Sequence, residues 1–89
     1  MPAPFVVHLT QTFQGDLERL PAAAQEKILQ ALRRLETNPF GPPPKVKKLK
    51  GTSVGQWRLE VWPYCVRYDV IGREVALYRV HHRMEIYRD

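Results

Sequence analysis

The sequence predicts a small α+β domain in which two N-terminal antiparallel helices pack on one face of a twisted, mainly antiparallel sheet, in the order β-α-α-β-β-β. Three observations lead to this prediction. Apolar residues recur at helical spacing between residues 13 and 35, they alternate at strand spacing after residue 56, and a proline-rich connector separates the two halves. At 89 residues, the chain is expected to form one domain over residues 1–89 with one core.

The first half of the chain predicts one strand and two helices. Residues 5–9 are rich in β-branched and aromatic types and predict a strand, and Thr10 is a residue type that caps helices. Over residues 11–20 the apolar side chains fall at i, i+4 and i+7, and after Pro21, which a first helical turn tolerates, the same spacing predicts a longer second helix. The apolar positions are Phe13, Leu17 and Leu20, then Ala24, Ile28, Leu32 and Leu35.

The second half predicts strands. Four of the eight residues in 37–44 are prolines, so this connector cannot sustain regular hydrogen bonding. A short basic strand over residues 46–50 and a turn over 51–55 follow, then strands over 56–62, 64–70 and 74–80. Alternation turns one side of these strands toward the helices: Trp57, Leu59, Val61, Tyr64, Val66 and Tyr68. The other side exposes Arg58, Glu60, Cys65, Arg67 and Asp69, and we expect it to form a concave site.

The positive charge of the chain is confined to its second half. The net charge is +5, and residues 1–44 contribute none of it, because they carry four Lys and Arg against four Asp and Glu. Residues 45–89 carry ten basic against five acidic residues. Such a segregated charge attracts polyanions, although a merely solvated basic face is the simpler interpretation.

Neither a cofactor nor a membrane segment is expected. The one cysteine, Cys65, cannot form an internal disulfide, and the chain lacks the paired Cys and His spacing of a zinc site. The apolar run at residues 5–9 has no preceding basic region and is too short for a signal peptide. We therefore expect a cytoplasmic protein with 44% hydrophobic and 26% charged residues, an ordinary soluble composition.

The segment 78–88 concentrates groups suited to RNA cleavage without a metal ion. That reaction needs a base for a ribose 2′-OH, cations for the phosphate and a proton donor for the departing 5′ oxygen. Arg83 could hold phosphate oxygens in a fork, or be a surface cation. Tyr87 could relay a proton or stack on a base, although its local context favours a packed anchor.

Two further groups have open roles. His81 and His82 are adjacent on a strand and point to opposite faces, so only one imidazole can face the site. Glu60 is a general base or, slightly favoured, an ion-pair partner. Cys65 is interpreted as a small, partly apolar side chain, because no spacing supports a dedicated base for it.

Four segments together, 47–51, 56–59, 64–70 and 80–88, resemble the RelE branch of the RelE/ParE toxin superfamily over nearly the whole chain. The resemblance implies a RelE-like fold and an mRNA interferase that cuts translated mRNA in the ribosomal A site without metal, leaving a 2′,3′-cyclic phosphate. It also implies a cognate antitoxin as partner, in a hetero-oligomer.

Carried over by position, Arg58, Arg83 and Tyr87 match basic and tyrosine positions of the family's site. Two positions depart from the pattern: Glu60 stands where a second basic residue is common, and Cys65 where arginine follows the strand tyrosine. Arg67 lies two residues further on the same face and could substitute for that arginine. Further RNA contacts are expected from His82, Lys47, Lys48 and Lys50.

Three functions remain open at this point. The leading one is an endoribonuclease in which Arg58, Arg67 and Arg83 bind the phosphate, His82 or Glu60 is the base, and Tyr87 assists proton transfer. The second is a ParE-like toxin that inhibits DNA gyrase by contact. The third is a degenerate member that only binds antitoxin or RNA, which the departures at Glu60 and Cys65 make credible.

Overall fold

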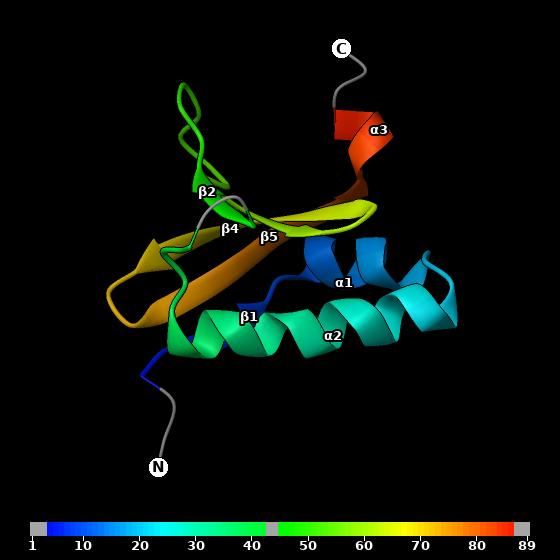
Figure 1. Ribbon diagram of the computed structural model, residues 1–89, viewed down its shortest axis with the longest axis horizontal. Coiled ribbons are helices and arrows are strands. Elements are labelled where there is room, and N and C mark those ends of the chain that lie inside the picture. The colour runs from blue at the N-terminus through cyan, green and yellow to red at the C-terminus, as the bar shows by residue number, and fades with distance from the viewer. Residues whose placement is uncertain (1–3, 43–44, 87–89) are drawn as a thin grey trace.

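A five-stranded sheet is covered on one face by two antiparallel helices (Figure 1). This computed structural model describes residues 4–42 and 45–86. The elements in chain order are β1 (Val6–Leu9), α1 (Gln11–Glu18), α2 (Ala22–Thr37), β2 (Val46–Lys48), β3 (Trp57–Val61), β4 (Tyr64–Ile71), β5 (Glu74–His82) and α3 (Arg83–Ile86).

The strand order in the sheet is β1-β5-β4-β3-β2. Only β1 and β5 pair in parallel, and the other three pairs are antiparallel, so the predicted α+β class and mainly antiparallel sheet are confirmed. The predicted short basic strand is present as β2, which pairs with β3, so four strands follow the helices where the predicted order has three. The structure adds α3 after β5, where four residues are too few for helical periodicity to indicate a helix.

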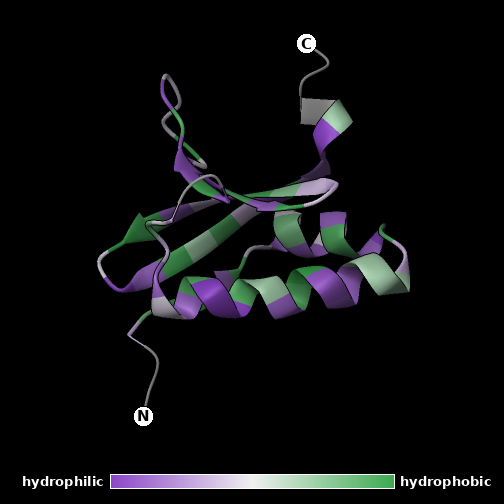
Figure 2. Ribbon diagram, viewed as in Figure 1, coloured by the Kyte–Doolittle hydropathy of each residue, from purple (hydrophilic) through white to green (hydrophobic). Residues whose placement is uncertain are grey.

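The core lies between the helices and the sheet, as the alternation predicted, and Figure 2 shows hydrophobic residues along the facing sides of both layers. Leu59, Val61, Val66 and Tyr68 are buried there, and Trp57 and Tyr64 are partly buried against them. The Tyr68 hydroxyl donates to the carbonyl of Pro39 at 2.6 Å, which ties the connector to the core, and burial raises the pKa of Tyr68. The helices contribute Phe13, Leu17, Ile28, Leu32 and Leu35.

The first helix, α1, is joined to β5 by hydrogen bonds near its start and near its end. Thr10 caps α1 as predicted: its Oγ1 accepts from the Phe13 N–H at 3.1 Å and donates to the Leu77 carbonyl at 2.8 Å. β1 pairs with β5 only as far as Leu77. Beyond that point the buried carboxylate of Asp16 takes the place of a strand and accepts from the Val80 N–H at 3.2 Å. Thus α1 continues the edge where β1 ends.

None of the helices in the described part of the chain has the length and apolar character needed to cross a membrane.

Candidate nucleic-acid interface

The face of the sheet away from α1 and α2 carries one basic residue from each of four neighbouring strands. Strand pairing sets Lys47 of β2 opposite Arg58 of β3, Arg58 opposite Arg67 of β4, and Arg67 opposite Arg79 of β5. Directly opposed residues share a face, and the adjacent row of Val46, Leu59, Val66 and Val80 is buried toward the helices. We call Lys47, Arg58, Arg67 and Arg79 the basic row.

A second row lies beside the basic row on the same face. Pairing sets Glu60 opposite Cys65 and Cys65 opposite His81. Burial raises the pKa of the Cys65 thiol; the Arg58 charge opposes this, the Glu60 charge adds to it, and the Arg83 charge opposes it. Two cations and a carboxylate therefore act electrostatically on one buried thiol. With its pKa raised, the thiol stays protonated at neutral pH, which agrees with the interpretation of Cys65 as an apolar side chain.

The guanidinium of Arg67 holds the loop between β2 and β3. Its Nε donates to the Gly55 carbonyl at 3.0 Å, and its Nη2 donates to the Val54 carbonyl at 3.0 Å and the Thr52 hydroxyl at 3.2 Å. From the same strand, the Asp69 carboxylate accepts from the backbone N–H groups of Gly55 and Gln56 at 2.7 and 2.9 Å. The residue expected to substitute for the missing arginine is thus turned toward this loop.

Arg79 is a member of the face that sequence reasoning missed. Its Nε and Nη2 donate to the two carboxylate oxygens of Asp16, both at 3.0 Å. Burial by itself raises the pKa of Asp16, but the hydrogen bonds from Arg79 and Val80 and the nearby positive charges bring it below its ordinary value. Arg79 and His81 alternate along β5, which indicated that they share a face of the sheet. Which face they share depends on the pairing of β5 with β4.

The structure separates the two histidines as predicted, but it places His81, not His82, on the face of Arg58. His82 lies opposite Tyr64, and their ring centres are 5.6 Å apart in an edge-to-face contact. The His82 Nδ1 also accepts from the Met84 N–H at 3.2 Å. The side chain proposed from the sequence as a base therefore lies on the helix side of the sheet.

The predicted lysines are divided between the faces. Lys47 belongs to the basic row, whereas Lys48 lies opposite Trp57, with its Nζ 5.7 Å from the centre of that ring. Lys50 is exposed in the bend after β2. Tyr87 lies outside the described residues. Within those residues no group of three or more His, Cys, Asp or Glu side chains is arranged to hold a metal ion.

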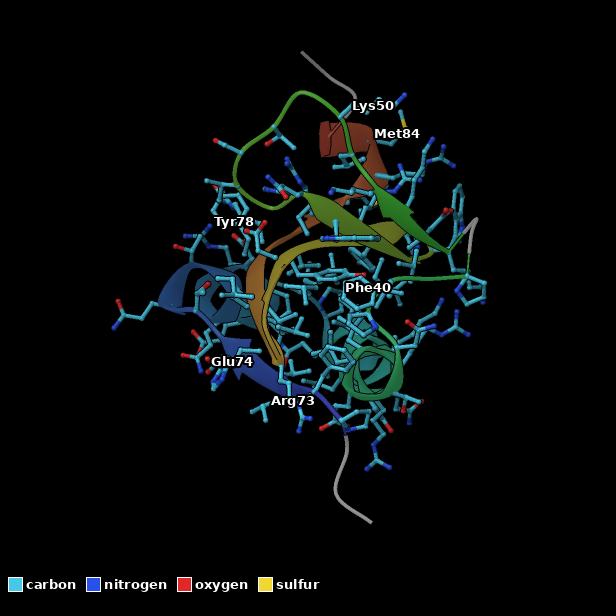
Figure 3. All side chains as sticks on the ribbon, turned by 90° about the vertical axis from the view of Figure 1, so that its left-hand side faces the viewer. Phe40, Lys50, Arg73, Glu74, Tyr78 and Met84 are labelled. Atoms are coloured by element: carbon cyan, nitrogen blue, oxygen red, sulfur yellow. The ribbon has the colours of Figure 1, made fainter. Side chains whose placement is uncertain are left out.

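Two segments project from the same side of the sheet as the basic row. The β2–β3 loop and α3 both extend away from α1 and α2 (Figure 1), and Lys50 of the loop and Met84 of α3 lie at the opposite end of the molecule from Arg73 and Glu74 (Figure 3).

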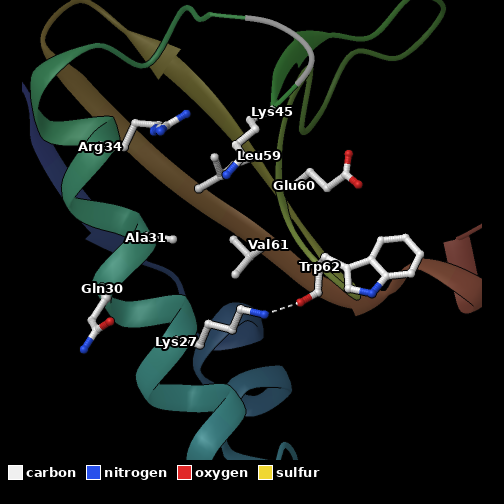
Figure 4. A pocket seen from close by; sticks show the side chains of 9 residues that line it. All are labelled: Lys27, Gln30, Ala31, Arg34, Lys45, Leu59, Glu60, Val61 and Trp62. Atoms are coloured by element: carbon white, nitrogen blue, oxygen red, sulfur yellow. Dashed lines mark hydrogen bonds between the residues drawn. The ribbon is translucent and has the colours of Figure 1, made fainter.

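A cavity of about 590 Å³ lies between α2 and β3, with Lys27, Arg34 and Lys45 among its lining residues. Figure 4 shows the Glu60 carboxylate and the Trp62 ring pointing away from α2.

Comparison with known proteins shows the class of protein to which this fold belongs. A family model described as the ParE toxin of the type II toxin-antitoxin system, parDE, matches residues 7–87. The chain belongs to this ParE toxin family, within the RelE/ParE superfamily, and is the toxin of a type II toxin-antitoxin system. No curated protein matches the sequence.

Several solved structures of similar fold are toxin–antitoxin complexes. A RelE–RelB complex from Pyrococcus horikoshii OT3 aligns with 25% identity over 90% of this chain and 96% of that chain, with a TM-score of 0.73. A RelB–RelE complex from Methanococcus jannaschii aligns with 28% identity over 90% and 94%, with a TM-score of 0.68. The RelBE2 complex of Mycobacterium tuberculosis, at 24% identity over 90% and 99% and a TM-score of 0.71, has the same fold.

Proposed function

We propose that this toxin is an endoribonuclease that cleaves mRNA in the ribosomal A site by attack of a ribose 2′-OH on the adjacent phosphate, without a metal ion. The observation that carries the proposal is the placing of Arg58 and Glu60 beside Cys65 on the free face, with Arg83 stacked on Trp62 at the β3–β4 turn. The reaction leaves a 2′,3′-cyclic phosphate and a 5′-hydroxyl end.

The basic row supports binding of a polyanion. Like charges directly opposite one another in a sheet destabilise the pairing of the two strands. The basic row contains three successive pairs of like charge. A bound phosphate backbone reduces the repulsion between them. Residues that break a local stability rule are typical of functional sites.

The chemical roles follow from where each side chain lies. Arg58 and Arg83 stabilise the phosphate as negative charge develops on its oxygens. The 2′-OH proton passes to Glu60 or to His81, which both lie on this face, and O2′ then attacks the phosphorus. Tyr87 stays a predicted assistant in proton transfer to the departing 5′ oxygen.

The test is to induce the protein and map mRNA 5′ ends, with Arg58→Ala and Arg83→Ala as variants. Arg73→Ala is a matched control, because Arg73 is an exposed arginine in the turn at the far end of the sheet (Figure 3). Codon-phased cuts that disappear in the two site variants and persist in the control support the proposal. Intact mRNA during growth arrest contradicts it.

A second candidate is inhibition of DNA gyrase by contact, which the match to the ParE toxin model favours. A supercoiling assay with purified gyrase separates the two. Blocked supercoiling with intact mRNA indicates the gyrase inhibitor. Normal supercoiling, intact mRNA and normal growth indicate a non-catalytic member that binds only antitoxin or RNA.

We also propose that an antitoxin neutralises this toxin in a cytoplasmic hetero-oligomer. The similar RelE structures were solved with RelB antitoxins, which supports the proposal. Co-expression with a small protein encoded by a neighbouring gene should restore growth and yield a stable complex on size-exclusion chromatography. Separate elution of the two chains would contradict it.

A further inference from the structure

We infer that Trp62 is a positioning residue that holds the guanidinium of Arg83 for phosphate binding, an inference that rests on the proposed RNA cleavage. Arg83 Cζ lies 4.5 Å from the centre of the Trp62 ring. Arginine stacks on aromatic faces through its planar, delocalised cation, and tryptophan is the best such partner. Trp62 itself is 55% exposed, so its ring is not needed to fill the core.

Both backbones at this contact are fixed by hydrogen bonds. Lys27 of α2 donates from its Nζ to the Trp62 carbonyl at 2.6 Å (Figure 4), and the Arg83 N–H donates to the carbonyl of Pro63 at 2.8 Å. The turn between β3 and β4 is thus tied both to the helix layer and to the start of α3. The indole, which points away from α2, is presented from an anchored backbone to the arginine.

The position of the stack explains why a large apolar ring stays exposed in this turn. An arginine side chain has many rotamers, and ordering them on each binding event weakens its contact with a phosphate. A cation that is already oriented toward the reacting group needs no such ordering. Because Trp62 follows β3, the strand that carries Arg58, the stack holds the Arg83 guanidinium at that end of the sheet.

The test is a double-mutant cycle in steady-state RNA cleavage with Trp62→Ala, Trp62→Phe, Arg83→Ala and the Trp62→Ala/Arg83→Ala pair. Trp62→Ala should lower kcat roughly tenfold with KM nearly unchanged, Trp62→Phe should recover most of the rate, and Trp62→Ala should have no further effect once Arg83 is alanine. Ile71→Ala is the control, because Ile71 is an exposed apolar residue at the other end of β4.

An additive loss in the Arg83→Ala background would overturn the inference and show direct contact between Trp62 and RNA. A Trp62→Ala enzyme with unchanged kcat would overturn it as well. Proton NMR of the Arg83 side chain gives a readout independent of activity: its Hδ signals should lie upfield from the ring current of Trp62 and return to ordinary positions in Trp62→Ala. Upfield signals in a wild-type protein that cleaves no RNA contradict the proposed function, whereas ordinary signals in an active one contradict the stack.

Discussion

The arginines on the free face of the sheet fall into two groups with different surroundings. Arg67 and Arg79 donate to oxygens supplied by the chain itself, in the β2–β3 loop and in α1. Arg58 lies opposite Arg67 in the basic row beside the buried Cys65, and Arg83 stacks on the exposed ring of Trp62. We propose that the first group chiefly stabilises the scaffold and that the second binds the phosphate. Substitutions should separate the two groups.

The largest effect is expected from the second group. Arg58→Ala and Arg83→Ala should each lower the rate of RNA cleavage about 100-fold or more, because each removes a fixed donor to the charge that develops in the transition state. Thermal unfolding checks the fold of each variant, and the loss of rate should exceed what any loss of stability explains. Arg79→Ala should show the reverse pattern, with reduced stability and a smaller loss of rate. A rate loss in Arg79→Ala as large as that in Arg83→Ala would contradict the division of the arginines into a structural and a phosphate-binding group.

The Asp16 carboxylate should account for a large part of the stability of α1 on β5. Asp16→Asn should lower the free energy of unfolding by about 1–2 kcal/mol, because it weakens two charge-assisted bonds to a partly exposed arginine and one to the buried Val80 N–H. Glu18→Gln, an exposed change in the same helix, is the control. Equal urea midpoints for the two variants would contradict the assignment.

The same carboxylate should make stability depend on pH. The pKa of Asp16 in the folded chain lies below its ordinary value, so its contribution is present above the unfolded pKa of about 3.9. The contribution is lost as the pH falls through the lower, folded pKa. Urea unfolding at pH 5 and at pH 2.5 should therefore show a wider stability gap for the wild type than for Asp16→Asn.

The loop held by Arg67 should give a more local effect on stability. Gly55 has a φ of +63°, and a Cβ there would lie 2.7 Å from Cδ2 of Tyr78, so Gly55→Ala should destabilise the fold by about 1–2 kcal/mol. Gly15 lies in α1 with nothing within 4 Å of an added Cβ, so Gly15→Ala should stabilise it by about 0.5–1 kcal/mol. Thermal unfolding measures both. Shifts of the same sign would show that the loop is not packed on β5.

Local periodicity was enough to predict most of the fold and the membership of its faces. Alternation placed Arg58, Glu60, Cys65 and Arg67 together, because a period of two needs no knowledge of neighbouring strands. The partners of Arg67 and Arg79 depend instead on the path of a loop and on β1 ending before β5. Likewise, strand register decides which of His81 and His82 lies on the free face. The stack of Trp62 on Arg83 joins the β3–β4 turn to the start of α3, which is far away in the sequence. These contacts follow from tertiary arrangement, which spacing alone does not contain.

The smallest effect on activity is expected from a change at Cys65. This change tests whether the site lacks a phosphate-binding cation at that position. Cys65 lies beside Glu60 and His81, between the charges of Arg58 and Arg83, so an arginine there would have a carboxylate neighbour and could extend toward solvent from the free face. Cys65→Arg should raise kcat/KM several-fold, and Cys65→Ser, which removes the thiol without adding charge, should leave it nearly unchanged. Because Arg67 is occupied by the loop, it cannot mask this gain. A Cys65→Arg protein that folds normally but cleaves no faster would mean that Arg58 and Arg83 suffice to hold the phosphate.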